Sequence, residues 1–264
     1  MTDINLKGRV ALVTGGGRGI GRAVCLALAD AGAAVAVNYR RDDEAAKQLV
    51  EAVTANGGTA AAFPAAIGDD EAMRAMIDAV GEQLGTIDIV VNNAGLASRG
   101  HSVLDTDPAE LHRLMAVNAY GPHRLAQLVL PGMRTAGRGD FVFISSVETR
   151  WLSPNTAPYV MSKSAMEALA LTLAKEEVAH GIHVNVVAPG VVATEMGKRL
   201  VAAKLGVNIT ALDATYPFGH VCTPEDVASV VLFLVSGLSG YVTGQQIAVD
   251  GGLNRPPATA AVED

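Results

Sequence analysis

The sequence is poor in cysteine. Its 264 residues include two, Cys25 and Cys222, which lie far apart in the chain. This separation gives no metal-like spacing, so we predict no metal site and expect two buried free thiols in a reducing compartment. A cytoplasmic location is the corresponding expectation.

Clusters of positive charge and long apolar runs are also missing. The net charge is −7 and no stretch is rich in Lys and Arg, which argues against nucleic acid or an anionic membrane as a partner. No apolar run is long enough to span a bilayer, and the opening MTDINLKGRVALVTGG has no basic segment followed by an apolar one, so no secretory signal is expected. What remains is a chain that is 50% hydrophobic and long enough to bury a large core.

What the sequence does have is a regular alternation of β-branched runs with helical patterns. We predict strands at 9–15, 33–39, 59–63, 87–95, 140–146 and 182–190. Helices are predicted at 20–32, 42–58, 69–84, 107–135 and 157–176. Such alternation predicts an α/β fold, a doubly wound parallel sheet with helices on both faces. No internal boundary is visible, so 1–264 is predicted to be one domain with a loose, Pro-rich tail at about 254–264.

A glycine-rich segment, TGGGRGIG at 14–21, follows the first predicted strand and opens the first helix. Gly15, Gly19 and Gly21 would let the backbone approach a pyrophosphate, and the helix N-terminus would supply N–H groups. A dinucleotide site is therefore one interpretation. A glycine-rich turn without a ligand and a site for S-adenosylmethionine also fit this segment taken alone.

Small and polar residues follow the later strands too, at the sheet edge where ligands bind in this fold class. NNAG (92–95) ends the fourth strand, Ser145 and Ser146 end the fifth, and PGVVATEM (189–196) follows the sixth. Taken singly, these are equally an Asn-rich turn, a capping serine and a helix cap at Thr194. Their common position at one edge is what makes them candidates for a shared site.

The helix predicted at 157–176 begins with a phenol and an ammonium on the same face. Tyr159 and Lys163 are four residues apart and are therefore neighbours on a helix. The lysine stem could simply lie along the aromatic ring. Alternatively, the ammonium lowers the phenol's pKa from its usual value near 10, which would make Tyr159 a general acid/base. The spacing alone is compatible with both.

Taken in order, these motifs resemble the short-chain dehydrogenase/reductase family. The match covers about residues 6–252 and includes the closing VDGG at 249–252. Within the family, the sequence is most similar to the 3-oxoacyl-(acyl carrier protein) reductase type, a label that covers enzymes with many substrates. The resemblance implies a single-domain Rossmann fold of about seven strands and hydride exchange between a nicotinamide and a small carbonyl or alcohol substrate.

The resemblance also implies roles for particular residues. Tyr159 would protonate the carbonyl oxygen, Lys163 would lower the pKa of Tyr159 and bind the nicotinamide ribose, and Ser146 would polarise the substrate oxygen. Asn118 would anchor a water relay to the lysine. The residues expected at the cofactor are Gly15, Arg18, Gly19, Ile20, Arg40, Asn92, Ala94, Gly95, Tyr159, Lys163, Pro189, Gly190 and Thr194. In the family, the helices corresponding to 107–135 and 159–179 build a dimer face, so a homotetramer or homodimer is expected.

The end of the second strand predicts NADP(H) rather than NAD(H). NAD-dependent relatives place an Asp where this chain has Tyr39, and the next residue is Arg40. Arg18 lies within the glycine motif beside the same ribose. Two guanidinium groups would hold a 2′-phosphate. The alternative is that Arg40 and Arg41 merely pair with the acids at 42–43.

Several features depart from the family pattern or leave the function open. Ala66 stands where relatives often carry an Asp near the adenine, and Asp69 is too far along to replace it with certainty. The expected substrate lid at 191–222 and the loop at 147–156, with Trp151, are idiosyncratic and do not name a substrate. Trp151 fits a pocket wall and a packing role equally. A non-redox enzyme on this fold, such as an epimerase or dehydratase, and a silent dinucleotide-binding regulator remain alternatives. His101 and His112 are expected on the surface.

Overall fold

The computed structural model describes residues 4–253, and the tail expected at 254–264 lies outside the described residues. A seven-stranded, wholly parallel sheet runs through the described part of the chain in the order β3-β2-β1-β4-β5-β6-β7. The strands are β1 Val10–Val13, β2 Ala34–Tyr39, β3 Thr59–Pro64, β4 Ile89–Asn92, β5 Gly139–Ile144, β6 Ile182–Pro189 and β7 Gln246–Val249. The α/β, doubly wound fold predicted from the sequence is confirmed.

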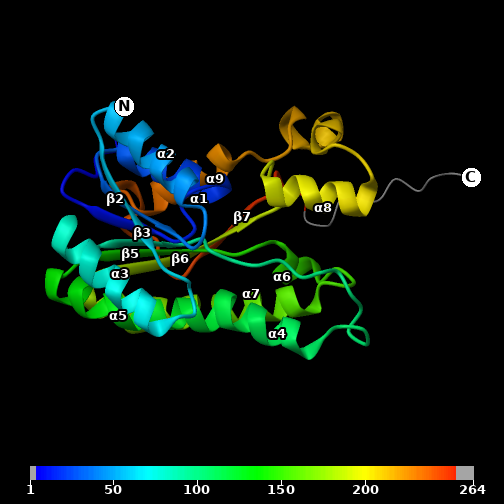
Figure 1. Cartoon of the computed structure of the whole chain (residues 1–264), viewed down its shortest axis with the longest axis horizontal. Coiled ribbons are helices and arrows are strands. Elements are labelled where there is room, and N and C mark those ends of the chain that lie inside the picture. Colours follow the sequence, from blue (N-terminus) through cyan, green and yellow to red (C-terminus); the bar gives the residue numbers. More distant parts are fainter. Residues whose placement is uncertain (1–3, 254–264) are drawn as a thin grey trace, which may run out of the picture.

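Helices cover the sheet on both faces (Figure 1). One face carries α1 Gly19–Asp30, α2 Asp43–Ala55 and α9 Pro224–Leu234, and the other carries α3 Asp70–Gln83, α5 Gly121–Ala136 and α7 Ala157–Glu177. The helices α4 Pro108–Met115, α6 Glu148–Trp151 and α8 Glu195–Leu205 lie beyond the carboxyl ends of the strands. None of the helices within residues 4–253 is long and apolar enough to cross a membrane.

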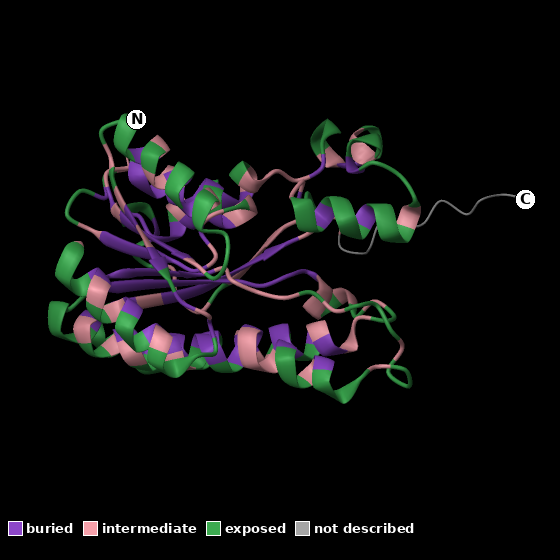
Figure 2. Cartoon of the chain, viewed as in Figure 1, coloured by how far each residue is buried: buried purple, intermediate pink, exposed green. Residues whose placement is uncertain are grey.

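Each strand contributes to two apolar layers because successive side chains point to opposite faces. In β1, Ala11 and Val13 pack with α1, α2 and α9, whereas Val10 and Leu12 pack with α3, α5 and α7. The central strands β1, β4 and β5 are accordingly buried, the edge strands β3 and β7 are partly exposed, and the outer helix faces are exposed (Figure 2). Two-sided burial explains why a central strand such as β1, VALV, is apolar throughout.

The elements begin and end close to the predicted positions, with two informative differences. The helix predicted at 107–135 is interrupted by a π-helical turn, Ala116–Tyr120, between α4 and α5. The strand predicted at 87–95 stops at Asn92, because the next two backbone N–H groups donate to the Thr14 side chain and not to a strand. Both irregularities lie at the candidate site.

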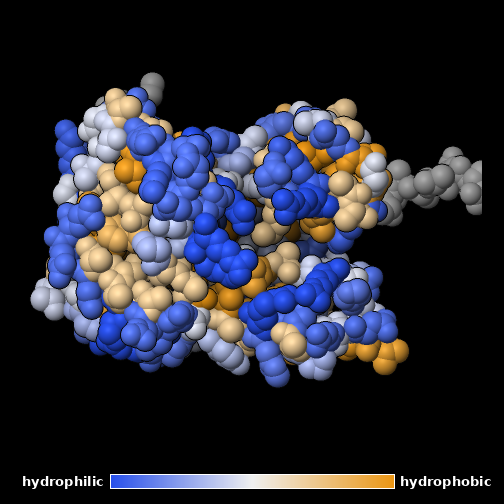
Figure 3. Space-filling model, in the orientation of Figure 1, coloured by the Kyte–Doolittle hydropathy of each residue, from blue (hydrophilic) through white to orange (hydrophobic). Residues whose placement is uncertain are grey.

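The strand order reverses between β1 and β4, which are neighbours in the sheet although two strands separate them in sequence. Ligands in doubly wound sheets bind outside the carboxyl ends of the strands at this switch point. Here the surface is hollowed between the part that carries α8 and the part that carries α4 and α6 (Figure 3). The candidate site therefore lies in this hollow, at the carboxyl ends of β1, β4, β5 and β6.

Candidate active site

Thr14 and Gly15 join the glycine segment to the end of β4. Thr14 Oγ1 accepts hydrogen bonds from the backbone N–H groups of Asn93 and Ala94, each at 2.9 Å. The Asn93 amide donates back to the carbonyl oxygens of Thr14 (2.8 Å) and Gly15 (3.2 Å). Hydrogen bonds within the protein therefore hold together the two segments that are predicted to contact the cofactor.

Asn38, which the sequence analysis did not single out, fixes the other side of the same loop. Its side-chain oxygen accepts from the Gly15 N–H at 3.2 Å, and its amide donates to the carbonyl oxygens of Phe63 (3.3 Å) and Ala65 (3.1 Å). Asn38 is buried, and it ties β2 and the end of β3 to the glycine segment. The position of this Asn near the end of an apolar strand was the sequence signal that could have pointed to its role.

Gly21 is required by close backbone packing. A Cβ at this position would lie 2.4 Å from the carbonyl oxygen of Gly15 and 2.6 Å from Asn93 Nδ2. The neighbouring Gly17 has room, since its nearest neighbour would be the Ala46 nitrogen at 3.5 Å. The glycine pattern therefore reflects packing of α1 against its own loop as well as any ligand.

We expect Gly21→Ala to destabilise the protein even without cofactor. Overpacking against backbone costs about 1–3 kcal/mol and exceeds the gain in helix propensity of about 1 kcal/mol. Gly17→Ala, the matched control, should change the free energy of unfolding by less than about 0.5 kcal/mol. Urea denaturation of both variants checks this, and equal stabilities would contradict the packing argument.

The N-terminus of α1 suits an anion. Arg18 is its N-cap, no side chain caps the helix, and its first turn contains no acidic residue. The first N–H groups and the positive end of the helix dipole are therefore available to a pyrophosphate. Gly19 has a φ of +54°, and a Cβ there would lie 3.2 Å from Thr194 Cγ2, so the start of the lid reaches over this loop.

The end of β4 brings an unsatisfied donor to the site. Asn92 is buried, and its Nδ2 has no hydrogen-bond partner among the described residues. Such a group is costly unless a ligand or water satisfies it. Together with the uncapped α1, it shows that the residues present fit a dinucleotide. Within residues 4–253 no cluster of three or more His, Cys, Asp or Glu side chains could hold a metal ion.

Gly95, Asn118 and Lys163 converge although they come from a loop, the π-helical turn and α7. A Cβ on Gly95 would lie 3.3 Å from Asn118 Oδ1 and 3.4 Å from Lys163 Nζ. Lys163 is buried, and its Nζ donates to the Ile144 carbonyl oxygen at 2.7 Å. A side chain at position 95 would therefore crowd both the ammonium and the Asn118 amide.

Asn118 is fully buried, and both N–H donors of its side-chain amide are used. Oδ1 accepts from the Leu96 N–H at 2.9 Å, and Nδ2 donates to the Leu96 carbonyl oxygen at 3.0 Å and to Ser162 Oγ at 2.9 Å. The side chain thus pins the loop after β4 to α7. A π turn at functional sites displaces the helix backbone by one residue, and here it carries Asn118.

Ser146 and Tyr159 form the part of the site that would meet a substrate. Ser146 follows β5, Tyr159 lies in the first turn of α7, and their side chains are close enough for Ser146 to affect the pKa of Tyr159. The pKa of Tyr159 is raised to about 12, chiefly by burial; the interaction with Ser146 lowers it, and Glu148 and Glu167 raise it further. Burial and the two carboxylates outweigh the lowering by Ser146, so the pKa of Tyr159 stays above its ordinary value. The lowering expected of Lys163 stays a prediction.

The pKa of Lys163 is shifted in the opposite direction to that of Tyr159. Burial lowers the pKa of its ammonium to about 8, and the charge of Glu167 partly offsets that effect. Desolvation penalises the charged form of both groups, so it favours a neutral phenol and a neutral amine. Of the two groups, Lys163 has the pKa closer to neutral pH, whereas Tyr159 stays protonated there.

The end of β6 completes the rim of the site. Pro189 is the last residue of β6 and accepts from the Val147 N–H at 3.0 Å, which ties the Ser146 turn to β6. Gly190 donates to the Val249 carbonyl oxygen at 3.0 Å. Thr194 caps α8, accepting from the Gly197 N–H at 3.1 Å. The capping role expected for Thr194 is confirmed, and its cofactor role stays a prediction.

The region expected to hold the adenosine ribose contains Arg18 and Arg40, which form no salt bridge within the described chain. Asp42 caps α2 by accepting from the Ala45 N–H at 3.3 Å. Asp43 instead accepts from Tyr39 Oη at 2.6 Å and pairs with Lys47 at 2.6 Å. Within the described chain neither acid pairs with Arg18, Arg40 or Arg41. The alternative that Arg40 and Arg41 pair with Asp42 and Asp43 is therefore wrong, although both arginines are exposed to solvent as it assumed.

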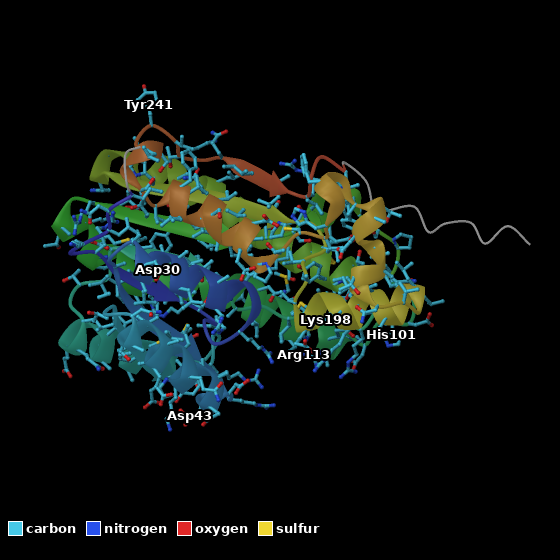
Figure 4. All side chains as sticks on the ribbon, turned by 90° about the horizontal axis from the view of Figure 1, so that it is seen from above. Asp30, Asp43, His101, Arg113, Lys198 and Tyr241 are labelled. Carbon is cyan, nitrogen blue, oxygen red and sulfur yellow. The ribbon has the colours of Figure 1, made fainter. Side chains whose placement is uncertain are left out.

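The remaining sequence predictions can be placed. Asp69 caps α3 by accepting from the Ala72 N–H at 3.1 Å, so it does not take over the position of Ala66. His101 and His112 are exposed, as expected. His101 lies at the same end of the molecule as Lys198 on α8, far from Asp43 on α2 (Figure 4). Trp151 is half-buried in α6, which leaves both of its interpretations open.

The comparisons with known proteins agree with this geometry. Residues 15–254 match the family profile described as "Enoyl-(Acyl carrier protein) reductase". The chain is 37% identical to versicolorin reductase of Emericella nidulans (96% of this chain, 98% of the other) and 35% identical to a 3-oxoacyl-[acyl-carrier-protein] reductase of Staphylococcus aureus (92% and 97%).

Solved structures show the same fold with cofactors present. A 7α-hydroxysteroid dehydrogenase complexed with NADH and 7-oxo glycochenodeoxycholic acid superposes with a TM-score of 0.86 at 31% identity, covering 95% of this chain and 96% of that one. A gluconate 5-dehydrogenase from Burkholderia cenocepacia in complex with NADP and tartrate has a TM-score of 0.86 at 35% identity, covering 95% and 97%. The chain therefore belongs to the short-chain dehydrogenase/reductase family, whose members bind nicotinamide dinucleotides and act as oxidoreductases.

Proposed function

We propose that this protein, acting as a single Rossmann-type domain, is an NADPH-dependent reductase of a small ketone and that Tyr159 is its general acid. The observation that carries the proposal is the convergence of Ser146, Tyr159, Lys163 and Asn118 at the switch point of the sheet. When bound, the nicotinamide supplies a hydride to the carbonyl carbon.

Ser146 and Tyr159 then act on the carbonyl oxygen. Both hydroxyls donate hydrogen bonds to it, which stabilises the negative charge that develops as the carbon is reduced. The phenol transfers its proton to the oxygen and gives the alcohol. A pKa raised to about 12 keeps Tyr159 protonated at neutral pH, which is the form that reduction requires.

Lys163 and Asn118 restore the proton. A protonated Lys163 stabilises the phenolate left after transfer and bonds the nicotinamide ribose. Asn118, held next to Lys163 by the loop after β4, anchors the water through which a proton returns from solvent. The remaining cofactor contacts proposed are Gly15, Ile20, Ala94 and Gly95 at the loops, with Pro189, Gly190 and Thr194 at the end of β6.

The preference for NADPH rests on Arg18 and Arg40. Both guanidinium groups are exposed beside the ribose position, and the nearby acids are engaged elsewhere. A 2′-phosphate carries nearly two negative charges and accepts bidentate hydrogen bonds from guanidinium. Tyr39, where an NAD-binding Asp would stand, offers no carboxylate to the ribose.

The substrate is proposed to be a largely apolar ketone. Large apolar side chains are exposed on both elements that border the hollow: Val103 and Leu104 in the loop after β4, and Met196 and Leu200 on α8. Figure 3 shows apolar surface within and beside the hollow. A 3-oxoacyl thioester and a cyclic ketone both fit this lining, and relatives named for each substrate class exist.

A panel of ketones and alcohols, followed at the nicotinamide absorbance with both cofactors, tests the function. We expect NADPH consumption with at least one apolar ketone, and the panel includes 3-oxoacyl thioesters and polycyclic ketones. Cofactor binding without consumption by any ketone or alcohol would instead support the silent regulator or the non-redox enzyme.

We also propose a homodimer or homotetramer in the cytoplasm. Two free thiols, Cys25 and Cys222, suit a reducing compartment. Along α7 and just after it, the apolar side chains Met161, Leu171 and Val178 are exposed, which would be a liability on a monomer.

Light scattering should give the mass of a dimer or tetramer at micromolar concentration. Leu171→Glu places a charge on the α7 face and should shift the mass to a smaller species. Leu104→Glu, at an exposed loop on the other side of the site, should leave the mass unchanged. A wild-type monomer under these conditions would refute the assembly.

A further inference from the structure

Glu167 lies on the same side of α7 as Tyr159 and Lys163, at successive spacings of four residues. Its Oε1 accepts hydrogen bonds from Ser145 Oγ and from Gln246 Nε2 at 2.7 Å. Thr149 Oγ1 lies 2.9 Å from the same oxygen, and its single proton is shared with the Ser146 carbonyl oxygen at 2.8 Å. The sequence motifs gave no role to this carboxylate.

The three donors come from three different parts of the fold. Ser145 directly follows β5 and precedes Ser146, Thr149 lies in α6, and Gln246 begins β7. Hydrogen bonds to a carboxylate are about twice as strong as neutral ones. None of the three donors is charged, so they fix the position of the carboxylate without a cation that would cancel its charge.

We propose that Glu167 is a positioning residue that keeps Lys163 protonated during turnover. The carboxylate is one helical turn from the ammonium, and its position is fixed by the same segment that carries Ser146. This inference rests on the proposed function, because the charge of Lys163 matters only if the phenolate of Tyr159 has to be stabilised.

Among the groups around Lys163, Glu167 is the one whose negative charge favours the protonated amine. Asn118 from the π turn, Gly95 from the β4 loop and Ile144 from β5 present only uncharged groups to the ammonium. The other charged or titratable groups near the pair are Glu148, which acts on Tyr159, and Arg150, whose guanidinium donates to Gln246 at 3.1 Å.

The pKa shifts agree with this arrangement. Burial lowers the pKa of Lys163 to about 8, and Glu167 is the charge that opposes this effect. Without Glu167 the pKa of Lys163 would fall further, and the ammonium would be lost at a lower pH. Glu167 also raises the pKa of Tyr159, so its loss would lower that value as well.

Glu167→Gln separates charge from geometry, because the amide oxygen has two lone pairs and can accept the hydrogen bonds from Ser145 and Gln246. We expect the alkaline decline of the reduction rate to move to lower pH by on the order of one unit, the size expected for losing a nearby, partly screened charge. The pH at which alcohol oxidation rises should move in the same direction. A purely structural role would reduce the rate without moving either midpoint.

Glu176→Gln is the matched control, since Glu176 is exposed on the same helix. It should leave both midpoints in place. If Glu167→Gln also leaves them in place, the inference is wrong.

NMR titration of the ¹³Cε signal of Lys163, assigned by its loss in Lys163→Arg, gives a readout without turnover. The midpoint should be near pH 8 in the wild type and lower in Glu167→Gln, whereas equal midpoints overturn the inference. This measurement decides the role of Glu167 even if the wild type reduces no ketone, an outcome that would sink the proposed function alone.

Discussion

Replacing Tyr159 with Phe is expected to lower turnover by several orders of magnitude while the cofactor still binds. The substitution removes the transferable proton and keeps the ring, so packing at the start of α7 is preserved. A general acid contributes about 10²- to 10⁴-fold to the rate, and the loss of hydrogen-bond donation to the carbonyl oxygen adds to this. Steady-state kinetics and a fluorescence titration with NADPH provide the two readouts.

Tyr120→Phe is a suitable control, because Tyr120 is exposed on the π turn and lies outside the proposed machinery. It should retain wild-type turnover. Activity of Tyr159→Phe within a few-fold of wild type would remove Tyr159 from the reaction.

Arg40→Asp should weaken NADPH binding by roughly 10²-fold or more and change NADH binding little. The variant loses a charge-assisted hydrogen bond worth about 1.5–3 kcal/mol and places a carboxylate near the phosphate. It also creates a partner for the ribose hydroxyls of NAD. The ratio of catalytic efficiencies with the two cofactors measures the effect.

Arg41→Asp is the matched control, with the same change of charge one residue further along the exposed turn. It should alter the ratio far less than Arg40→Asp. A wild-type enzyme that uses NADH as efficiently as NADPH would contradict the role given to Arg18 and Arg40.

The sheet could be predicted because its signals are local. A buried parallel strand such as β1 is a continuous apolar run, and helices such as α2 and α3 begin with acidic caps, Asp42 and Asp69. The candidate residues after β1, β4, β5 and β6 could be placed together because strand ends in this fold share one edge. The roles of Asn118, Tyr159 and Lys163, which lie on helices, were implied only by the family resemblance.

The features that could not be predicted depend on interactions between segments that are distant in the sequence. The π turn at Ala116–Tyr120 has no local signature, and Asn118 is held there by the backbone of Leu96. The pKa of Tyr159 was expected to fall beside Lys163, but the degree of burial that raises it is a property of the whole fold. Glu167 was missed for the same reason, since its donors come from β5, α6 and β7.

Hydride transfer itself is the central claim, and isotope transfer tests it most directly. Wild-type enzyme is supplied with NADPH carrying deuterium at the transferable position of the nicotinamide and with a ketone identified by the substrate panel. We expect mass spectrometry to find one deuterium on the carbinol carbon of the product, with one NADPH oxidised per alcohol formed. An alcohol without deuterium from either face of the labelled ring, or a product formed with no NADPH oxidised, would contradict the account.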